Sequence, residues 1–248
     1  MPAKFHIEDR IAVVTLARPE RLNAISSDLL DALVTALDQA EASNADVILL
    51  QAEGRAFCAG DDLTELVANV PTSEYAADFV ARLQSISRKL MFGSKPVICA
   101  AQGYIVGGGA AWPLNADFSV LADDAILFCP EANWGMFPSG GVTALLPACC
   151  GPVRASEIIW RGIRVNAAQL VADGIAGQAV PNAQLAETAR ALANEIADLP
   201  AASRRRMKAL RSQQWQERIE AAMAIESRYC RESALDPEMR AKVKGAQE

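Results

Sequence analysis

Two apolar segments that each end in a glycine-containing turn constrain the fold of this chain more than any other feature. Residues 95–106 form a mostly apolar run that leads into the triple glycine at 107–109. About forty residues earlier, the apolar run 47–50 leads into the turn 57–63, Phe-Cys-Ala-Gly-Asp-Asp-Leu. A turn that joins a strand to a helix can direct backbone N–H groups at one point. Two such turns therefore predict a site for negative charge that develops during a reaction.

Length and charge restrict the class of protein. The chain has 248 residues, of which 51% are hydrophobic, enough for one large domain or one domain with an appendage. The formal net charge of −6 argues against a nucleic-acid-binding protein, which needs clustered basic charge. The densest basic cluster comprises residues 204–206 with Lys208 and Arg211, in a segment with helical character. We interpret this cluster as the solvated face of a helix.

The sequence offers no membrane segment and no metal site. No run of about 18 apolar residues is present, and residues 1–10 lack the apolar core of a signal peptide, so we expect a cytoplasmic location without membrane contact. The six cysteines form no CxxC pair, which favours reduced thiols. The single histidine, His6, alternates with apolar neighbours in an expected strand, so no catalytic triad can be assembled around it. We expect no bound metal.

Strand and helix patterns alternate along most of the chain, which predicts an α/β fold with a parallel sheet. Strands are expected at 5–8, 11–16, 47–51, 95–101, 118–122, 126–129 and 179–180. Helices are expected at 27–42, 62–70, 73–92, from about 108, 143–149, 152–161 and 167–173, and through most of the chain after 181. We divide the chain into a core at 1–199 and a helical region at 200–248. The helical region is expected to pack either on a partner subunit or back on its own domain.

Five motifs in a fixed order resemble those of the crotonase superfamily, the enoyl-CoA hydratases and isomerases. They are residues 17–24 (Ala-Arg-Pro-Glu-Arg-Leu-Asn-Ala), 57–63, 95–109, 115–117 (Asn-Ala-Asp), and Pro130-Glu131 with Gly135 and Pro138. The resemblance implies a ClpP/crotonase-like spiral of ββα units with a C-terminal helical trimerisation region. It also implies a homotrimer or homohexamer that acts on acyl-CoA thioesters without a separate cofactor.

The resemblance further implies which residues form the site. The backbone amides of Asp61 and Gly108 correspond to the two donors that hold the thioester oxygen. Residues expected along the CoA are Arg21, Leu22, Ala24, Ala59, Gly60, Leu63, Gly107 and Pro130. Arg18 is a second candidate for a phosphate contact, because guanidinium groups suit phosphate.

The reaction depends on how many carboxylates the site contains. Hydratases of the superfamily use two glutamates, and the corresponding positions here are Ala111 and Glu131. Hydration requires one water to be positioned, activated and used as a proton source, whereas moving a double bond requires one base. The pattern therefore favours a Δ3-Δ2-enoyl-CoA isomerase with Glu131 as the base, its pKa raised by apolar neighbours. The Asp61 side chain either adds a second acid or points outward.

Three other functions remain open at this point. The first is an enoyl-CoA hydratase or another lyase or decarboxylase of the superfamily. The second is a catalytically silent CoA-binding oligomer. The third, a serine peptidase of the same fold, ranks last because Ser139 lacks a histidine partner.

Overall fold

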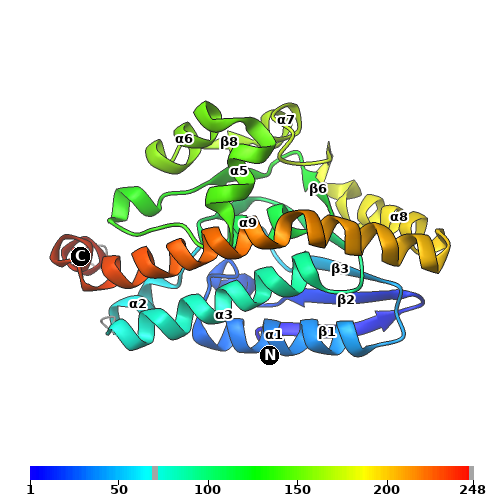
Figure 1. Ribbon diagram of the computed structural model, residues 1–248, viewed down its shortest axis with the longest axis horizontal. Coiled ribbons are helices and arrows are strands. Elements are labelled where there is room, and N and C mark those ends of the chain that lie inside the picture. The colour runs from blue at the N-terminus through cyan, green and yellow to red at the C-terminus, as the bar shows by residue number, and fades with distance from the viewer. Residues whose placement is uncertain (69–71, 246–248) are drawn as a thin grey trace.

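The computed structural model describes residues 1–68 and 72–245 and has an α/β architecture with two sheets (Figure 1). The larger sheet has the strand order β1-β2-β3-β4-β6-β9; β1 is antiparallel to β2 and the other neighbours pair in parallel. The smaller sheet pairs β5 with β7 in parallel and β7 with β8 in antiparallel orientation. The strands are β1 Ala3–Glu8, β2 Ile11–Leu16, β3 Val47–Ala52, β4 Val97–Ala101, β5 Tyr104–Val106, β6 Phe118–Ala122, β7 Ile126–Phe128, β8 Val165–Asn166 and β9 Gln178–Val180.

The helices follow the predicted alternation closely. They are α1 Ser27–Ala42, α2 Leu63–Ala68, α3 Ser73–Phe92, α4 Gly108–Asn115, α5 Val142–Cys150, α6 Pro152–Arg161, α7 Ala167–Ala172, α8 Leu185–Asp198, α9 Ala201–Leu235 and α10 Pro237–Gly245, with short 3-10 turns η1 Pro19–Arg21, η2 Glu131–Trp134 and η3 Asn182–Gln184. The predicted end of α2 at residue 70 and the proline at 71 lie outside the described residues. The strands β5 and β8 were not predicted, because each is only two or three residues long and gives little periodicity.

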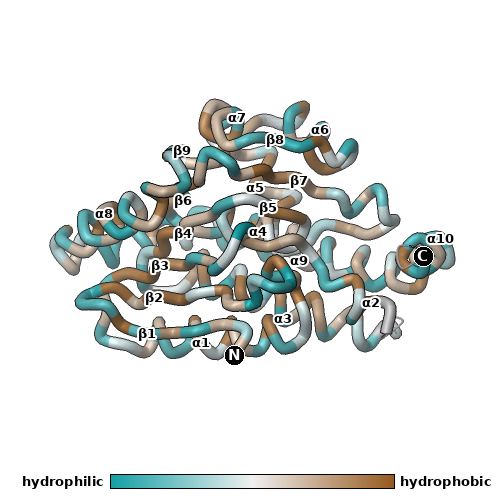
Figure 2. Tube along the Cα trace, turned by 180° about the vertical axis from the view of Figure 1, so that it is seen from behind, coloured by the Kyte–Doolittle hydropathy of each residue, from teal (hydrophilic) through white to brown (hydrophobic). Residues whose placement is uncertain are grey.

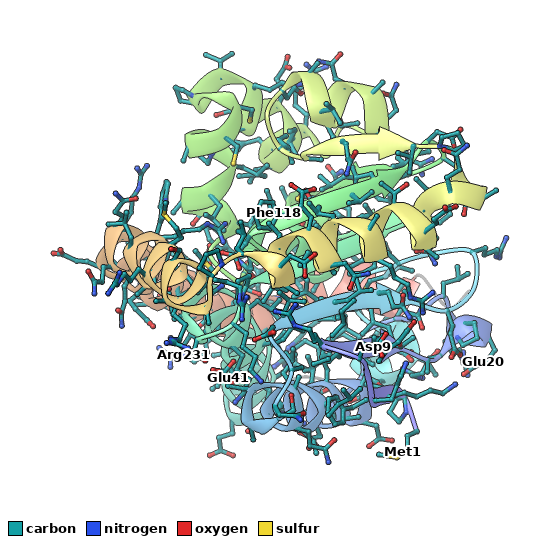
Figure 3. The ribbon with its side chains drawn as sticks, turned by 90° about the vertical axis from the view of Figure 1, so that its right-hand side faces the viewer. Met1, Asp9, Glu20, Glu41, Phe118 and Arg231 are labelled. Atoms are coloured by element: carbon teal, nitrogen blue, oxygen red, sulfur yellow. The ribbon has the colours of Figure 1, made fainter. Side chains whose placement is uncertain are left out.

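The large sheet carries a separate apolar layer on each face. On one face α8 packs its small and branched side chains against alternate residues of β2, β3, β4 and β6. Figure 3 shows this helix lying across the strands. On the other face lie α1, α3 and α4, whose buried side chains form the larger cluster. Figure 2 shows the strands stacked in order, with apolar residues concentrated along them. Strands buried on both faces explain why β3 and β4 read as continuous apolar runs.

Helix α9 spans 35 residues and lies along α3 (Figure 1). Gln84 donates a side-chain hydrogen bond of 2.8 Å to the carbonyl of Met223, and Arg88 pairs with Glu220 at 2.7 Å. The C-terminal helical region therefore docks on its own chain. The predicted division at residue 200 stays a prediction, and α9 begins one residue later.

The interpretation of the basic cluster as a solvated face was wrong for two of its members. Arg204 and Lys208 are buried, and their side chains reach across the chain. The Lys208 ammonium donates to the Leu90 carbonyl and to Asp117, both at 2.7 Å, and Arg211 pairs with Asp117 at 2.6 Å. These groups anchor α9 to the loop before β6. Sequence periodicity did not predict these contacts, because a lysine on an exposed helix face and a lysine in a buried ion pair occur in the same sequence pattern.

The remaining sequence expectations concern membrane contact and cysteine chemistry. Within residues 1–68 and 72–245, no helix is both long and apolar enough to cross a bilayer. Of the six free cysteines, Cys58, Cys99 and Cys129 are buried and Cys149 is exposed.

Candidate active site

The triple glycine forms the turn between β5 and α4, as expected. Gly107 has a φ of 56°, which favours glycine, and a Cβ atom added there would lie only 3.3 Å from Oε1 of Glu131. Gly108 is the first residue of α4, so its N–H has no acceptor one turn earlier within the helix. The absence of a side chain at this turn thus leaves room for the Glu131 carboxyl beside an open helix N-terminus.

The second glycine turn is held against the first by backbone hydrogen bonds. Cys58 donates to the carbonyl of Tyr104 at 3.0 Å and accepts from Val106 at 2.9 Å, which ties the segment to β5. Two residues after Cys58, the Gly60 carbonyl accepts a hydrogen bond from the Ile25 amide at 2.8 Å. The α-carbon of Gly60 lies 3.9 Å from the position of a Cβ atom on Gly107. The two turns predicted from the sequence are therefore in contact.

The amide of Asp61 is left free by this arrangement. Its neighbours take the hydrogen bonds of the bridge to Ile25: the Gly60 carbonyl accepts from Ile25, and Asp62 donates to the Ile25 carbonyl at 2.8 Å. Across residues 1–68 and 72–245, no acceptor is recorded for the N–H groups of Asp61 and Gly108. Both residues line the same two pockets. They are thus available to an oxygen atom of a ligand.

Glu131 is a buried carboxylate without a full set of partners. It begins η2, directly after Pro130, and its residue is 8% exposed. Its Oε2 atom is buried and has no hydrogen-bond partner among the described residues. Burial, with a smaller contribution from the nearby charge of Asp61, raises the pKa of Glu131 to about 7. A carboxyl group with this pKa can accept and return a proton near neutral pH.

The side chain of Asp61 points into the site rather than outward. Its Oδ1 atom lies 3.8 Å from the position of a Cβ atom on Gly108, and the residue lines both pockets. Burial raises the pKa of Asp61 to about 6. Of the two possibilities stated from the sequence, the structure favours a second acidic group near Glu131.

Two pockets meet at this point and share Asp61, Gly108, Glu131 and Met136. The first has about 620 Å³ of empty space, including open solvent at its mouth, and is mainly apolar. Its other lining residues are Leu66, Tyr75, Ala76, Phe79, Val80, Leu83, Phe137, Ser139, Cys230, Ser233, Ala234 and Met239. The second has about 690 Å³ of such space, and its other lining residues are Ala59, Gly60, Leu63, Val106, Gly107, Phe128, Pro130 and Trp134. A ligand with two dissimilar ends can occupy both pockets and place its middle against the free amides.

The residues expected along the CoA fall into two groups. Five of them line the second pocket: Ala59, Gly60, Leu63, Gly107 and Pro130. The other three lie in the adjoining segment and do not line it: the carbonyl of Leu22 accepts from the Ala59 amide at 3.0 Å, the carbonyl of Ala24 accepts from Arg18, and Arg21 is exposed in η1.

Of the two arginines proposed to contact a CoA phosphate, Arg18 already binds other groups of the protein. Its guanidinium donates to the Ala24 carbonyl at 2.9 Å and to Ser26 Oγ at 2.7 Å, and pairs with Asp62 at 3.1 Å. Arg21 remains the candidate for phosphate, because its side chain is exposed beside the second pocket's wall.

Sequence reasoning gave no role to one residue that holds the backbone before the 57–63 turn, and it missed one part of the pocket wall. Asn23 is fully buried with a φ of 54°, and its side-chain amide donates to the carbonyls of Glu53 and Ala56, both at 2.9 Å. Asparagine tolerates a left-handed backbone, which was the available signal. The missed part of the wall is formed by Cys230 and Met239 from α9 and α10. No local signal marks these two residues, because they reach the pocket from the far end of the chain.

Ala111, the position of the missing glutamate, is closed off from both pockets. It is fully buried, and its Cβ atom lies 2.7 Å from the position of a Cβ atom on Gly140. It does not line either pocket, so the site contains no space prepared for a longer side chain there.

Comparisons with known proteins were consistent with this geometry. A model of the enoyl-CoA hydratase/isomerase family matches residues 6–247. The chain is 35% identical over 200 residues to a 1,2-epoxyphenylacetyl-CoA isomerase of Escherichia coli, covering 79% of this chain and 76% of that protein. It is 30% identical over 225 residues to a crotonyl-CoA hydratase of Syntrophomonas wolfei, covering 89% and 85%.

Solved structures agree with the fold over nearly the whole chain. A structure described as a putative enoyl-CoA hydratase/isomerase from Acinetobacter baumannii superposes with a TM-score of 0.90 at 26% identity, covering 99% of this chain and 98% of the other. OdaA of Pseudomonas aeruginosa has the same fold, with a TM-score of 0.91 at 24% identity and coverage of 100% and 99%. The chain has the crotonase fold and belongs to the enoyl-CoA hydratase/isomerase family of enzymes.

Proposed function

We propose that the protein converts a 3-enoyl-CoA thioester into the conjugated 2-enoyl-CoA. The observation that carries this proposal is the coincidence of two free backbone amides with one buried carboxyl at the junction of two pockets. The amides of Asp61 and Gly108 would hold the thioester oxygen, while the acyl chain enters the apolar pocket and the CoA leaves through the second pocket. No further cofactor is required by this chemistry.

The reaction follows from what each group offers. Glu131, as the carboxylate, removes a proton from C2 of the 3-enoyl thioester. The electron pair delocalises into the carbonyl, and the resulting dienolate oxygen is stabilised by the two amides and the N-terminus of α4. Each such donor contributes on the order of 3 kcal/mol in a transition state. Return of a proton at C4 leaves the double bond between C2 and C3.

Hydration of a 2-enoyl-CoA is the second candidate, and one observation favours it. The Asp61 carboxyl lies in the same pockets as Glu131, so two carboxyl groups are available to position a water even though Ala111 has none. The two relatives named above carry one function each, an isomerase and a hydratase. The choice between the reactions therefore rests on a direct assay.

The test is a substrate panel with purified protein and the Glu131→Gln variant. We expect 3-enoyl-CoA to give the conjugated thioester, followed by its ultraviolet absorbance, and the variant to be slower by about 10³-fold. Equal rates for the two proteins would remove Glu131 from its role. More efficient formation of 3-hydroxyacyl-CoA from 2-enoyl-CoA would establish hydration instead, and CoA binding without turnover would indicate a silent binding protein.

A further inference from the structure

Two carboxyl groups approach one pair of consecutive glycines from different segments. Oε1 of Glu131 lies 3.3 Å from the position of a Cβ atom on Gly107, and Oδ1 of Asp61 lies 3.8 Å from that on Gly108. Because Gly107 and Gly108 are adjacent, the two carboxyl groups flank the same short stretch of backbone. Both line both pockets. A substrate held by the Gly108 amide would therefore lie within reach of two acids rather than one.

The adjacent aspartates 61 and 62 have opposite surroundings. Asp62 pairs with Arg18 at 3.1 Å, and its other oxygen accepts from the backbone of Thr64 at 3.2 Å at the start of α2. For the Asp61 side chain, no hydrogen bond or ion pair is recorded across the described residues. The contacts of Asp62 thus give its carboxyl a structural role. The Asp61 carboxyl has no such contacts among the described residues and points into the pocket.

The charges around the site favour one proton shared between the carboxyl groups of Asp61 and Glu131. An ionised Asp61 beside a developing dienolate would repel it, whereas a neutral carboxylic acid would not and would carry a proton to donate. Burial raises the pKa of Asp61 to about 6 and, together with the Asp61 charge, that of Glu131 to about 7, so the pair can hold one proton that either carboxyl group carries. The other titratable groups that interact with this pair are Cys58, Cys129, Cys230 and Glu226, and none of them is a cation.

We propose that Asp61 is the second proton-transfer group of the site and replaces, from a different segment, the carboxylate absent at position 111. This inference rests on the proposed isomerase function. Glu131 takes the proton from C2, and the C2–H electron pair passes into the dienolate. Asp61 gives its proton to C4, where a C–H bond forms as the dienolate collapses to the 2-enoyl thioester. The cycle ends with Glu131 protonated and Asp61 ionised, and proton exchange with solvent restores the starting state.

Isotope transfer distinguishes this scheme from a single-base shuttle. With substrate deuterated at C2 in ordinary water, one shuttling base carries part of the deuterium to C4, whereas two separate groups release it to solvent. We expect the wild type to form product without deuterium at C4. We expect Asp61→Asn to be slower by about 10- to 100-fold and to carry deuterium from C2 to C4 through Glu131 alone. Transfer to C4 in the wild type would overturn the proposal, as would an unchanged rate and unchanged isotope loss in the variant.

Asp62→Asn is the matched control, since it makes the same chemical change one residue away. It removes the ion pair with Arg18, so we expect a lower melting temperature but the same loss of deuterium as in the wild type. A change of isotope pattern in Asp62→Asn would show that the pattern reports loop structure rather than proton transfer, and would contradict the assignment.

A second readout does not depend on turnover. The Glu131 carboxyl can be titrated by ¹³C NMR in the wild type and in Asp61→Asn. Since the Asp61 charge raises the pKa of Glu131, removing it should lower that pKa below its value of about 7. An unchanged pKa would show that the two groups do not act on one another. Failure of the wild type to isomerise any 3-enoyl-CoA would reject the proposed function, and this titration would still decide the pairing.

Discussion

Glu131 and Glu226 are both buried glutamates, but their surroundings differ completely. Glu226, on α9, accepts hydrogen bonds from the Gly141 amide at 2.9 Å, the Thr143 amide at 3.1 Å and the Thr143 hydroxyl at 2.7 Å. These partners lie at the N-terminus of α5, where a carboxylate is favoured. Glu131 lines two pockets and leaves Oε2 without a hydrogen bond among the described residues.

The comparison teaches how to separate a structural carboxylate from a candidate for proton transfer. Burial raises the pKa of Glu226 too, but its hydrogen-bond donors oppose that shift, and the carboxyl joins two elements, α9 and α5. A buried carboxyl that lacks donors and faces a pocket has a raised pKa and can exchange a proton with a ligand. Burial alone does not distinguish the two residues; the number of hydrogen bonds does.

The largest expected effect is on activity and separates the two glutamates directly. Glu131→Gln should lower kcat by about 10³-fold, because the amide cannot take the C2 proton, while the unfolding transition stays at or above that of the wild type. Glu226→Gln should change kcat of the folded protein by less than about tenfold. Steady-state kinetics and thermal unfolding of both variants measure this. Similar losses of kcat in the two variants would abolish the distinction.

A second expected effect is the pH dependence of stability. Burial raises the pKa of Glu131 from 4.5 to about 7, so the folded state binds a proton more tightly than the unfolded state. The resulting stabilisation is fully present below pH 4.5 and is lost as the pH rises through 7, and it amounts to something on the order of 3 kcal/mol. Urea unfolding of the wild type and Glu131→Gln across this window should show a smaller loss in the variant. Parallel curves would show that Glu131 titrates normally.

The third effect concerns stability at the partnered glutamate. Glu226→Gln places a side-chain NH₂ group where backbone donors already converge, so at least one buried hydrogen bond is lost. We expect the free energy of unfolding to fall by about 2 kcal/mol at pH 7. Denaturant unfolding measures the loss, and Thr143→Val, which removes the hydroxyl donor, should reproduce a smaller part of it. No loss in either variant would mean that the hydrogen-bonded cap contributes little.

The same contrast explains what the sequence could and could not predict. The alternation of elements and the two glycine turns are local patterns, so the parallel sheet and the meeting of both turns beside Glu131 were predictable from the residues and the resemblance. The burial of Lys208 and the wall formed by Met239 depend on how α9 and α10 dock over a long sequence separation. No periodicity encodes those contacts, since the same residues would suit a solvated helix.

The side chain of Asp61 illustrates a further limit of pattern reading. The motif identified its amide as a donor, but the direction of the side chain depends on the bridge between Ile25 and Asp61. Similarly, the lack of a carboxylate at Ala111 suggested one acid, whereas the tertiary structure supplies a second from another segment. The motif left open whether Asp61 adds an acid to the site, and only the direction of its side chain in the tertiary structure decides this.

The smallest expected effect applies the same reasoning to the arginines beside the second pocket. Arg18 is held by Ala24, Ser26 and Asp62, so Arg18→Ala should lower the melting temperature by loosening this segment. Arg21 is exposed, and an exposed cation near a phosphate contributes about 1 kcal/mol or less. Arg21→Ala should thus raise KM for the CoA thioester by at most about fivefold, more at low salt than at high salt, without changing the melting temperature. If KM rises only in Arg18→Ala, then Arg18 rather than Arg21 contacts the phosphate. The number of hydrogen-bond partners would then not identify ligand-binding residues outside the buried site.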